Sequence, residues 1–377
     1  MIGFCGALDF DKRQVKFSEL KKMCGLHGVG SAFINGEFGI ICDGVWDFDS
    51  LSLQPVTVSY NNALYTAAVV VPAEIRGMEG NTAQGVLEGY FEEGDEYIRR
   101  LDFSYALALY DGRCGELLLV KGGKGDKALF YTQKDGTLYF SSSLRPLFRL
   151  YGGCVRVNRR VLLEHIKGGY SPIPDGLFED IHYIRASHSL LCSRFESKEI
   201  PFCSVSVSFS DKKILTPPEV LYFSKKTDMR KILTDALFAF DYPQFDYMLP
   251  LMLPYSESAG KGELGNIVIG DPIKCLREEY SLERADRIGG LWGVDILVVQ
   301  TDEEPISARE LKVIEKQIDI ILDEYRKIPT CVLANLEDSE LLGVINDEKD
   351  IKLRIRRKGM LVQTAMWFEC YNLVLTQ

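Results

Sequence analysis

Short apolar or alternating runs, separated by turn residues, fill the first two hundred residues of the chain. Alternation of apolar and polar positions over about four to eight residues is typical of β-strands. The dipeptides Asp111-Gly112, Gly122-Gly123 and Asp135-Gly136 are typical of tight turns. The pattern therefore predicts strands at residues 67–71, 105–110, 116–120, 128–131 and 137–141.

Two stretches between these runs repeat their apolar residues at helical spacing. The first covers residues 81–101, and the second covers residues 158–167. Helices that bury one face against a sheet form layered domains. We therefore predict an α+β domain over residues 1–203.

The character of the chain changes after this domain. Residues 204–220 are polar and contain Pro217-Pro218, which is typical of a linker. Beyond the linker, residues 266–269 read as a strand, and helical spacing dominates residues 228–240, 271–291, 307–327 and 359–373. In residues 307–327, one face carries an apolar stripe of Leu311, Ile314, Ile318, Ile321 and Leu322. We expect a smaller, mainly helical C-terminal domain over residues 221–377.

Composition excludes several classes of protein. The chain has 377 residues, 46% of them hydrophobic, which is enough for about two domains. A net charge of −10 disfavours nucleic acid and anionic membranes as partners. No apolar run reaches the ~18 residues of a membrane span, the first residues do not read as a secretory signal, and the ten cysteines include no C-x-x-C pair. We expect a cytoplasmic protein whose thiols are reduced and mostly buried.

Two glycine-rich motifs and the histidines add little chemistry. Residues 260–265 match G-x-G-x-x-G, but the predicted strand follows the motif instead of preceding it, so we interpret it as a connection. Residues 122–127 could cradle a phosphate, but no helix follows, and we interpret them as a hairpin turn. The four histidines lack metal-binding spacing. We expect no metal site and no bound cofactor.

Cys5 is the cysteine placed where a nucleophile near the start of the chain would lie. A terminal nucleophile must be the first residue of the mature chain, because its own α-amino group acts as the base. Cys5 comes four residues too late, and the bulk of Ile2 disfavours removal of Met1. We keep Cys5 as a weak catalytic candidate and expect it to be buried on the first strand.

A series of motifs occurs in a characteristic order: Y-A-L-A-L-Y-D at 105–111, G-D-K-A-L-F-Y at 125–131, Y-F-S-S-S-L-R-P-L at 139–147 and G-Y-S-P-I-P with L-F and I at 169–181. In that order they resemble F-A-F-A-L-W-D, R-D-R-x-G-x-K-P-L-Y-Y, F-A-S-E-L-K-A-L and G-Y-V-P-x-P…L-F-x-x-I of the glutamine-hydrolysing asparagine synthetases. Residues 362–371 are similar to a closing Q-x-x-x-W-L-x-x-Y helix of some bacterial members. The resemblance implies a four-layer αββα class II glutamine amidotransferase domain of the Ntn-hydrolase type, followed by a synthetase domain.

The positions that carry the family's chemistry differ in this sequence. Ile2 stands where the resemblance places the cysteine nucleophile. Pro72, Ala73 and Glu74 stand in place of an Asn-Gly-Glu that stabilises the oxyanion, and proline has neither a side-chain amide nor a backbone N–H. Thr82 replaces the aspartate that holds the α-amino group of glutamine. The synthetase loop Ser-Gly-Gly-x-Asp-Ser is absent from the sequence.

These departures favour a pseudoenzyme. We expect a degenerate asparagine synthetase-like protein with an inactive glutaminase domain and a reduced synthetase remnant, acting as a binding or regulatory subunit. Its partner would be an active synthetase or amidotransferase, or a second copy of the chain. One alternative is an ATP-dependent amide-forming activity completed by a partner chain. Another is a small-molecule site that reuses Pro72, Glu74 and Thr82.

Overall fold

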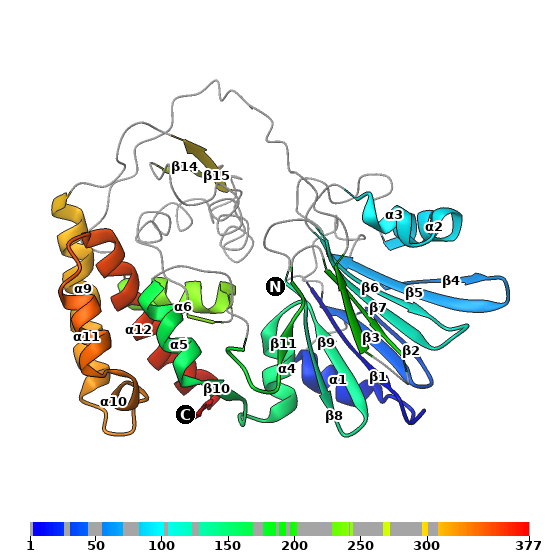
Figure 1. Cartoon of the computed structure of the whole chain (residues 1–377), viewed down its shortest axis with the longest axis horizontal. Helices are drawn as coiled ribbons and strands as arrows, with labels where there is room; N and C mark the ends of the chain where they lie inside the picture. Colours follow the sequence, from blue (N-terminus) through cyan, green and yellow to red (C-terminus); the bar gives the residue numbers. More distant parts are fainter. Residues whose placement is uncertain are drawn as a thin grey trace. The chain divides into compact units, whose positions relative to one another are not determined.

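The computed structural model divides the chain into two compact units. Unit 1 comprises residues 1–152 and 180–211, and unit 2 comprises residues 153–179 and 212–377. The structure describes residues 3–25, 31–43, 55–70, 83–101, 105–122, 128–168, 176–185, 188–193, 197–201, 228–240, 242–243, 267–271, 296–300 and 308–376. Figure 1 shows the arrangement of elements within each unit.

Unit 1 contains two six-stranded antiparallel sheets. The first sheet has the order β11-β8-β9-β1-β3-β2 and the second has the order β13-β12-β7-β6-β5-β4. The strands of the first sheet are β1 (Gly3–Asp9), β2 (Ser31–Asn35), β3 (Phe38–Asp43), β8 (Phe130–Lys134), β9 (Thr137–Ser141) and β11 (His182–Tyr183). The strands of the second sheet are β4 (Val56–Tyr60), β5 (Ala63–Val70), β6 (Tyr105–Asp111), β7 (Glu116–Gly122), β12 (His188–Cys192) and β13 (Ser197–Pro201).

Described helices cover the outer faces of the two sheets. Helices α1 (Phe17–Cys24) and α4 (Leu144–Tyr151) pack on the first sheet, and α2 (Ala83–Glu93) packs on the second, beside α3 (Asp95–Arg99). The main apolar core lies between the sheets, and a second core lies between the second sheet and α2 with α3. The expected αββα layering is therefore confirmed.

The strands predicted for unit 1 are confirmed, and the helix predicted over residues 158–167 exists as α5 (Arg159–Gly168) but belongs to unit 2. Two other predictions for unit 1 need correction. The helix expected over residues 81–101 is interrupted at Gly94, whose φ of 64° does not fit a helix, so α2 and α3 are separate. The turn expected at residues 122–127 is not a hairpin, because β7 pairs with β6 and β12 whereas β8 pairs with β9 and β11. The chain crosses there from one sheet to the other, and local turn residues do not encode that difference.

Unit 2 is mainly helical, as expected, and also contains short strands. Its described helices are α5 (Arg159–Gly168), α6 (Met229–Phe240), α9 (Ala308–Arg326), α10 (Leu333–Leu336), α11 (Ser339–Asn346) and α12 (Ile351–Tyr371). Strands β10 (Arg156–Asn158) and β16 (Val374–Thr376) form one parallel pair, and β14 (Ile267–Asp271) and β15 (Ile296–Gln300) form another. The strand expected at residues 266–269 therefore exists as β14.

Several expectations for the C-terminal half fall outside the described residues. These are the linker at 204–220, the motif at 260–265 and most of the helix at 271–291. The domain bounds drawn from the sequence thus stay a prediction. Within unit 2, the described residues 153–168 and 176–179 pack with the C-terminal helices: β10 pairs with β16, and the rings of Phe178 and Trp367 meet edge to face at 5.7 Å.

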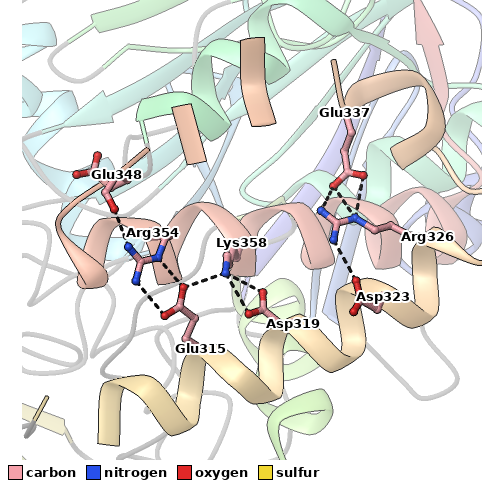
Figure 2. A network of polar contacts seen from close by, with 8 residues as sticks. All are labelled: Glu315, Asp319, Asp323, Arg326, Glu337, Glu348, Arg354 and Lys358. Atoms are coloured by element: carbon pink, nitrogen blue, oxygen red, sulfur yellow. Dashed lines mark hydrogen bonds and ion pairs between the residues drawn. The ribbon is translucent and has the colours of Figure 1, made fainter. Parts of the chain in front are cut away.

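A polar clamp joins the two longest described helices of unit 2 (Figure 2). All five residues of the predicted stripe on α9 are buried, which confirms that this helix packs on a neighbour. Beside the stripe, Glu315 accepts hydrogen bonds from Arg354 Nε at 2.6 Å and from Lys358 Nζ at 2.9 Å, and Lys358 also pairs with Asp319 at 2.8 Å. The α9–α12 clamp, defined by these four side chains, therefore adds charge pairing to apolar packing.

Candidate functional site

In unit 1, β1 of the first sheet and β6 of the second sheet start at the same end of the sandwich. Phe38 begins β3 opposite Leu8, near the far end of β1, and its ring stacks on Tyr110 near the end of β6 with centroids 4.2 Å apart. At the opposite end of the sandwich, the start of β1 at Gly3 and the start of β6 at Tyr105 therefore lie together. We call this the β1 end of the sandwich; it also includes Asp43, Val70 and Gly122.

Serine side chains hold the start of β1. The backbone N–H of Phe4 donates to Ser142 Oγ at 3.0 Å, and the N–H of Ser142 donates to the Phe4 carbonyl at 2.9 Å. Ser141 Oγ donates to the same carbonyl at 3.2 Å. A Cβ atom on Gly3 would lie 2.5 Å from Ser142 Oγ, so a larger residue would have to displace the hydroxyl that accepts from the Phe4 N–H. These serines belong to the motif at 139–147, which thus positions the start of β1.

Cys5 is fully buried in β1, as the sequence predicted. Phe4 and Leu8 belong to the core between the sheets, and neighbouring residues of a strand point to opposite faces. The side chain of Cys5 therefore points away from the space between the sheets, toward the face that α1 and α4 cover. Its thiol is in the wrong place to act on a substrate between the two sheets.

The other positions singled out from the sequence lie outside the described residues. They are Ile2, Pro72, Ala73, Glu74 and Thr82. The described strand β5 ends at Val70 and the described helix α2 begins at Ala83. The assignment of Ile2 to the nucleophile position, and of the other four residues to a glutamine pocket, stays a prediction.

Lys121 is a candidate that the sequence reasoning missed. It lies two residues beyond Leu119, which faces the core between the sheets, so its side chain starts on that same face at the β1 end. The residue is fully buried, between Ala106 and the half-buried His188 on the adjacent strands. A buried ammonium requires compensating negative or dipolar groups. The sequence signal for its burial was that Lys121 continues the alternate positions of β7 that Leu117 and Leu119 occupy in the core.

The thiols with resolved pKa shifts do not resemble activated nucleophiles. Burial raises the pKa of Cys192 to about 12 and that of Cys114 to about 11, whereas a reactive cysteine needs a lowered pKa. None of the eight described cysteines forms a disulfide; four of them are buried, so the expectation that most would be buried holds for half. In the described part of the chain, no group of three His, Cys, Asp or Glu side chains is placed to hold a metal. Its helices also include none long and apolar enough to cross a membrane.

Comparison with known families confirms the resemblance to amidotransferases. A family model for the glutamine amidotransferase domain matches residues 78–203. The chain is 27% identical over 143 residues to asparagine synthetase [glutamine-hydrolyzing] 3 of Bacillus subtilis (strain 168). That match covers 37% of this chain and 23% of the relative, so the matched part spans about a quarter of the relative's length.

Solved structures give a weaker likeness. Glutamine phosphoribosylpyrophosphate amidotransferase from B. subtilis, complexed with ADP and GMP, aligns at 12% identity and a TM-score of 0.38, covering 82% of this chain and 70% of that one. A structure described as the allosteric regulatory enzyme of purine biosynthesis aligns at 13% identity and a TM-score of 0.33, covering 82% and 62%. The functional argument therefore depends on the residues themselves.

Proposed function

Because residues 78–203 match the glutamine amidotransferase domain family, we propose that this chain is a pseudoenzyme: an asparagine synthetase-like protein that keeps the amidotransferase fold without glutaminase activity. The observation that carries the proposal is the placement of Cys5. Its buried thiol faces the helices, and Ile2, at the position that resembles the family's cysteine, has no nucleophilic group. The protein acts through binding, as a subunit or regulator of another protein.

Sequence differences at the old glutamine pocket support the same proposal. Pro72 has no N–H to stabilise an oxyanion, and Thr82 has no charge to hold an ammonium group. The synthetase half lacks the Ser-Gly-Gly-x-Asp-Ser loop, which argues against ATP-pyrophosphatase activity. Loss of functional residues at several independent positions is typical of a protein that no longer carries out the reaction of its family.

The direct test is release of ammonia from glutamine by the purified chain. We expect no release above that of the Cys5→Ser variant, because the buried thiol of Cys5 faces away from the space between the sheets. Circular dichroism and thermal melting check that both are folded. Glutaminase activity in the unsubstituted chain that disappears in Cys5→Ser would overturn the proposal.

A binding role requires a partner. Affinity purification of the chain from its native cytoplasm, where thiols stay reduced, is expected to recover an active synthetase or amidotransferase. Reconstitution of the two purified proteins then shows whether the chain alters the partner's rate. Recovery of no such enzyme, with no effect on candidate enzymes added directly, would contradict the regulatory role.

One observation favours the alternative, an ATP-dependent activity completed by a partner. Strands β14 and β15 are parallel, with Asp271 opposite Gln300 at their carboxyl ends. In open α/β sheets, ligands bind beyond the carboxyl ends of parallel strands. A ligand that binds only the native state must raise the melting temperature, so a clear upward shift with ATP supports this alternative, and no shift at saturating ATP argues against it.

A further inference from the structure

Strand β4 leaves one edge of the second sheet open. It pairs with β5 on one side, and no described strand pairs with its other side (Figure 1). The opposite edge strand of this sheet, β13, carries Lys198, Glu199 and Pro201, which are residues that discourage pairing between chains. Strand β4 has the sequence Val-Thr-Val-Ser-Tyr and carries no charge.

The turn that follows β4 shows which backbone groups face the open edge. Asn61 and Asn62 both have positive φ, at 49° and 62°, as a two-residue type I′ turn requires. In such a hairpin Tyr60 and Ala63 form a hydrogen-bonded pair, and bonded pairs alternate along the strands.

Thr57 and Ser59 fall between those bonded pairs. Ser59 lies opposite Leu64, whose carbonyl accepts from Gly112 N–H on the far side of β5, at 2.9 Å. The backbone of Leu64 therefore points away from β4, and that of Ser59 points away from β5. The N–H and C=O groups of Thr57 and Ser59 are thus directed at the open edge.

We propose that two copies of the chain form a symmetric dimer by antiparallel pairing of their β4 strands, with the two-fold axis at Val58. In this register Thr57 forms a bonded pair with Ser59 of the partner subunit, and Ser59 forms the same pair with the partner's Thr57. Val58 lies beside the partner's Val58, and Val56 lies beside the partner's Tyr60. Apolar and aromatic pairs of this kind stabilise antiparallel sheets.

The self-complementary register points to a second copy as the occupant, and the neutrality of the edge removes the charge obstacle to it. Each chain carries a net charge of −10, so two copies repel each other over most of their surfaces. Residues 54–66, which include β4 and its turn, contain no charged residue. A neutral, self-complementary strand lets two acidic chains approach without that repulsion.

Exposed apolar side chains mark the same hairpin. Tyr60 is 41% exposed and Leu64 is 39% exposed. The ring of Tyr60 stacks on Phe91 of α2 with centroids 4.3 Å apart, which holds it in place before a partner arrives. Pairing would cover this ring with the partner's Val56, at little cost in side-chain entropy.

Sedimentation velocity of the full chain over a concentration series tests the dimer. One five-residue strand from each chain makes a small interface, and interfaces below about 1,200 Å² are typical of weak complexes. We therefore expect the average mass to double only as concentration rises. Ser59→Pro removes an N–H that faces the open edge without removing a bond to β5, and is expected to abolish the doubling. Ser59→Ala keeps the N–H and is expected to dimerise like the unsubstituted chain.

Disulfide trapping tests the register. Val58→Cys places two thiols beside each other across the two-fold axis, so mild oxidation is expected to give a peptide map in which the two substituted positions are linked. Val56→Cys is the matched control, because its two thiols would be about 14 Å apart at ~3.4 Å per residue. A monomer at every concentration, a dimer that persists in Ser59→Pro, or equal cross-linking of both cysteine variants would overturn the proposal. None of these readouts depends on glutaminase activity.

Discussion

At the scale of single residues, β1 leaves no room for a side chain at Gly6. A Cβ atom there would overlap the ring of Phe140 and lie 2.6 Å from the carbonyl oxygen of Gly39. Overpacking a core of this kind typically costs about 1–3 kcal/mol. We therefore predict that Gly6→Ala lowers the free energy of unfolding by about that amount, measured by urea denaturation.

Gly343→Ala is the matched control for this substitution. Nothing lies within 4 Å of a Cβ atom at Gly343, and the residue is inside α11. Alanine is favoured over glycine inside a helix by about 0.5–1 kcal/mol, so this variant is expected to be slightly more stable. Equal stability of Gly6→Ala and the unsubstituted chain would show that β1 can shift to accept the methyl group.

At the scale of elements, the α9–α12 clamp couples helix packing to pH. Hydrogen bonds from Arg354, followed by those from Lys358, lower the pKa of Glu315 to about 2 from a usual value of 4.5. A carboxyl group with a lowered pKa stabilises the fold above its unfolded pKa, and this contribution is lost as pH falls toward the folded value. Glu315→Gln is therefore predicted to destabilise the chain by about 1–2 kcal/mol at neutral pH, after allowance for solvent screening.

The pH dependence distinguishes this effect from a simple packing change. Melting curves of Glu315→Gln and the unsubstituted chain are expected to converge as pH falls from about 4.5 toward about 2. Glu324→Gln is the control, because Glu324 also lies on α9 but forms a more exposed pair with Arg230. That variant is expected to change stability by less than about 1 kcal/mol. A difference for Glu315→Gln that stays constant with pH would contradict the assignment.

At the scale of the whole molecule, acid-sensitive groups are concentrated in unit 2. Hydrogen bonds lower the pKa values of Glu315, Asp338 and Glu348, and burial lowers the pKa of His165. The three carboxyl groups therefore contribute less stability as pH falls below their unfolded pKa values. His165 is buried in its neutral form, so it destabilises the fold as pH falls below its ordinary pKa of about 6.5. Among the described residues of unit 1, a lowered carboxyl pKa is resolved for Asp9, where hydrogen bonds from Arg13 and Thr137 outweigh the opposing effect of burial.

We therefore predict that acid unfolds unit 2 before unit 1. Brief digestion with pepsin over a series of falling pH values, followed by mass spectrometry, measures which peptides are released first. Peptides from residues 308–371 are expected to appear at a higher pH than peptides from residues 105–141. Release of both sets at one pH would show that the two units unfold as a single cooperative block.

The sequence predicted the strands of unit 1 well, because alternation of apolar and polar residues is a local property. The pairs Asp111-Gly112 and Asp135-Gly136 were assigned correctly as hairpin turns. The same reasoning failed at residues 122–127. There, the choice between a hairpin and a crossing to the other sheet depends on the distant strands with which β7 and β8 pair. The candidate site was less accessible to sequence: burial of Lys121 depends on the second sheet, which no local pattern reveals.

By itself, the sequence determined the amidotransferase-like motifs, the amphipathic pattern of α9 and the presence of isoleucine at position 2, because these depend on residue identity and spacing. Only the tertiary structure decided that Cys5 faces the helices, that the described residues 153–168 and 176–179 pack with the C-terminal helices, and that β4 lies at an open edge of the described sheet. Each of these depends on contacts between segments far apart in the chain. Such contacts arise from the free energy of burying whole faces together, which a local pattern does not contain.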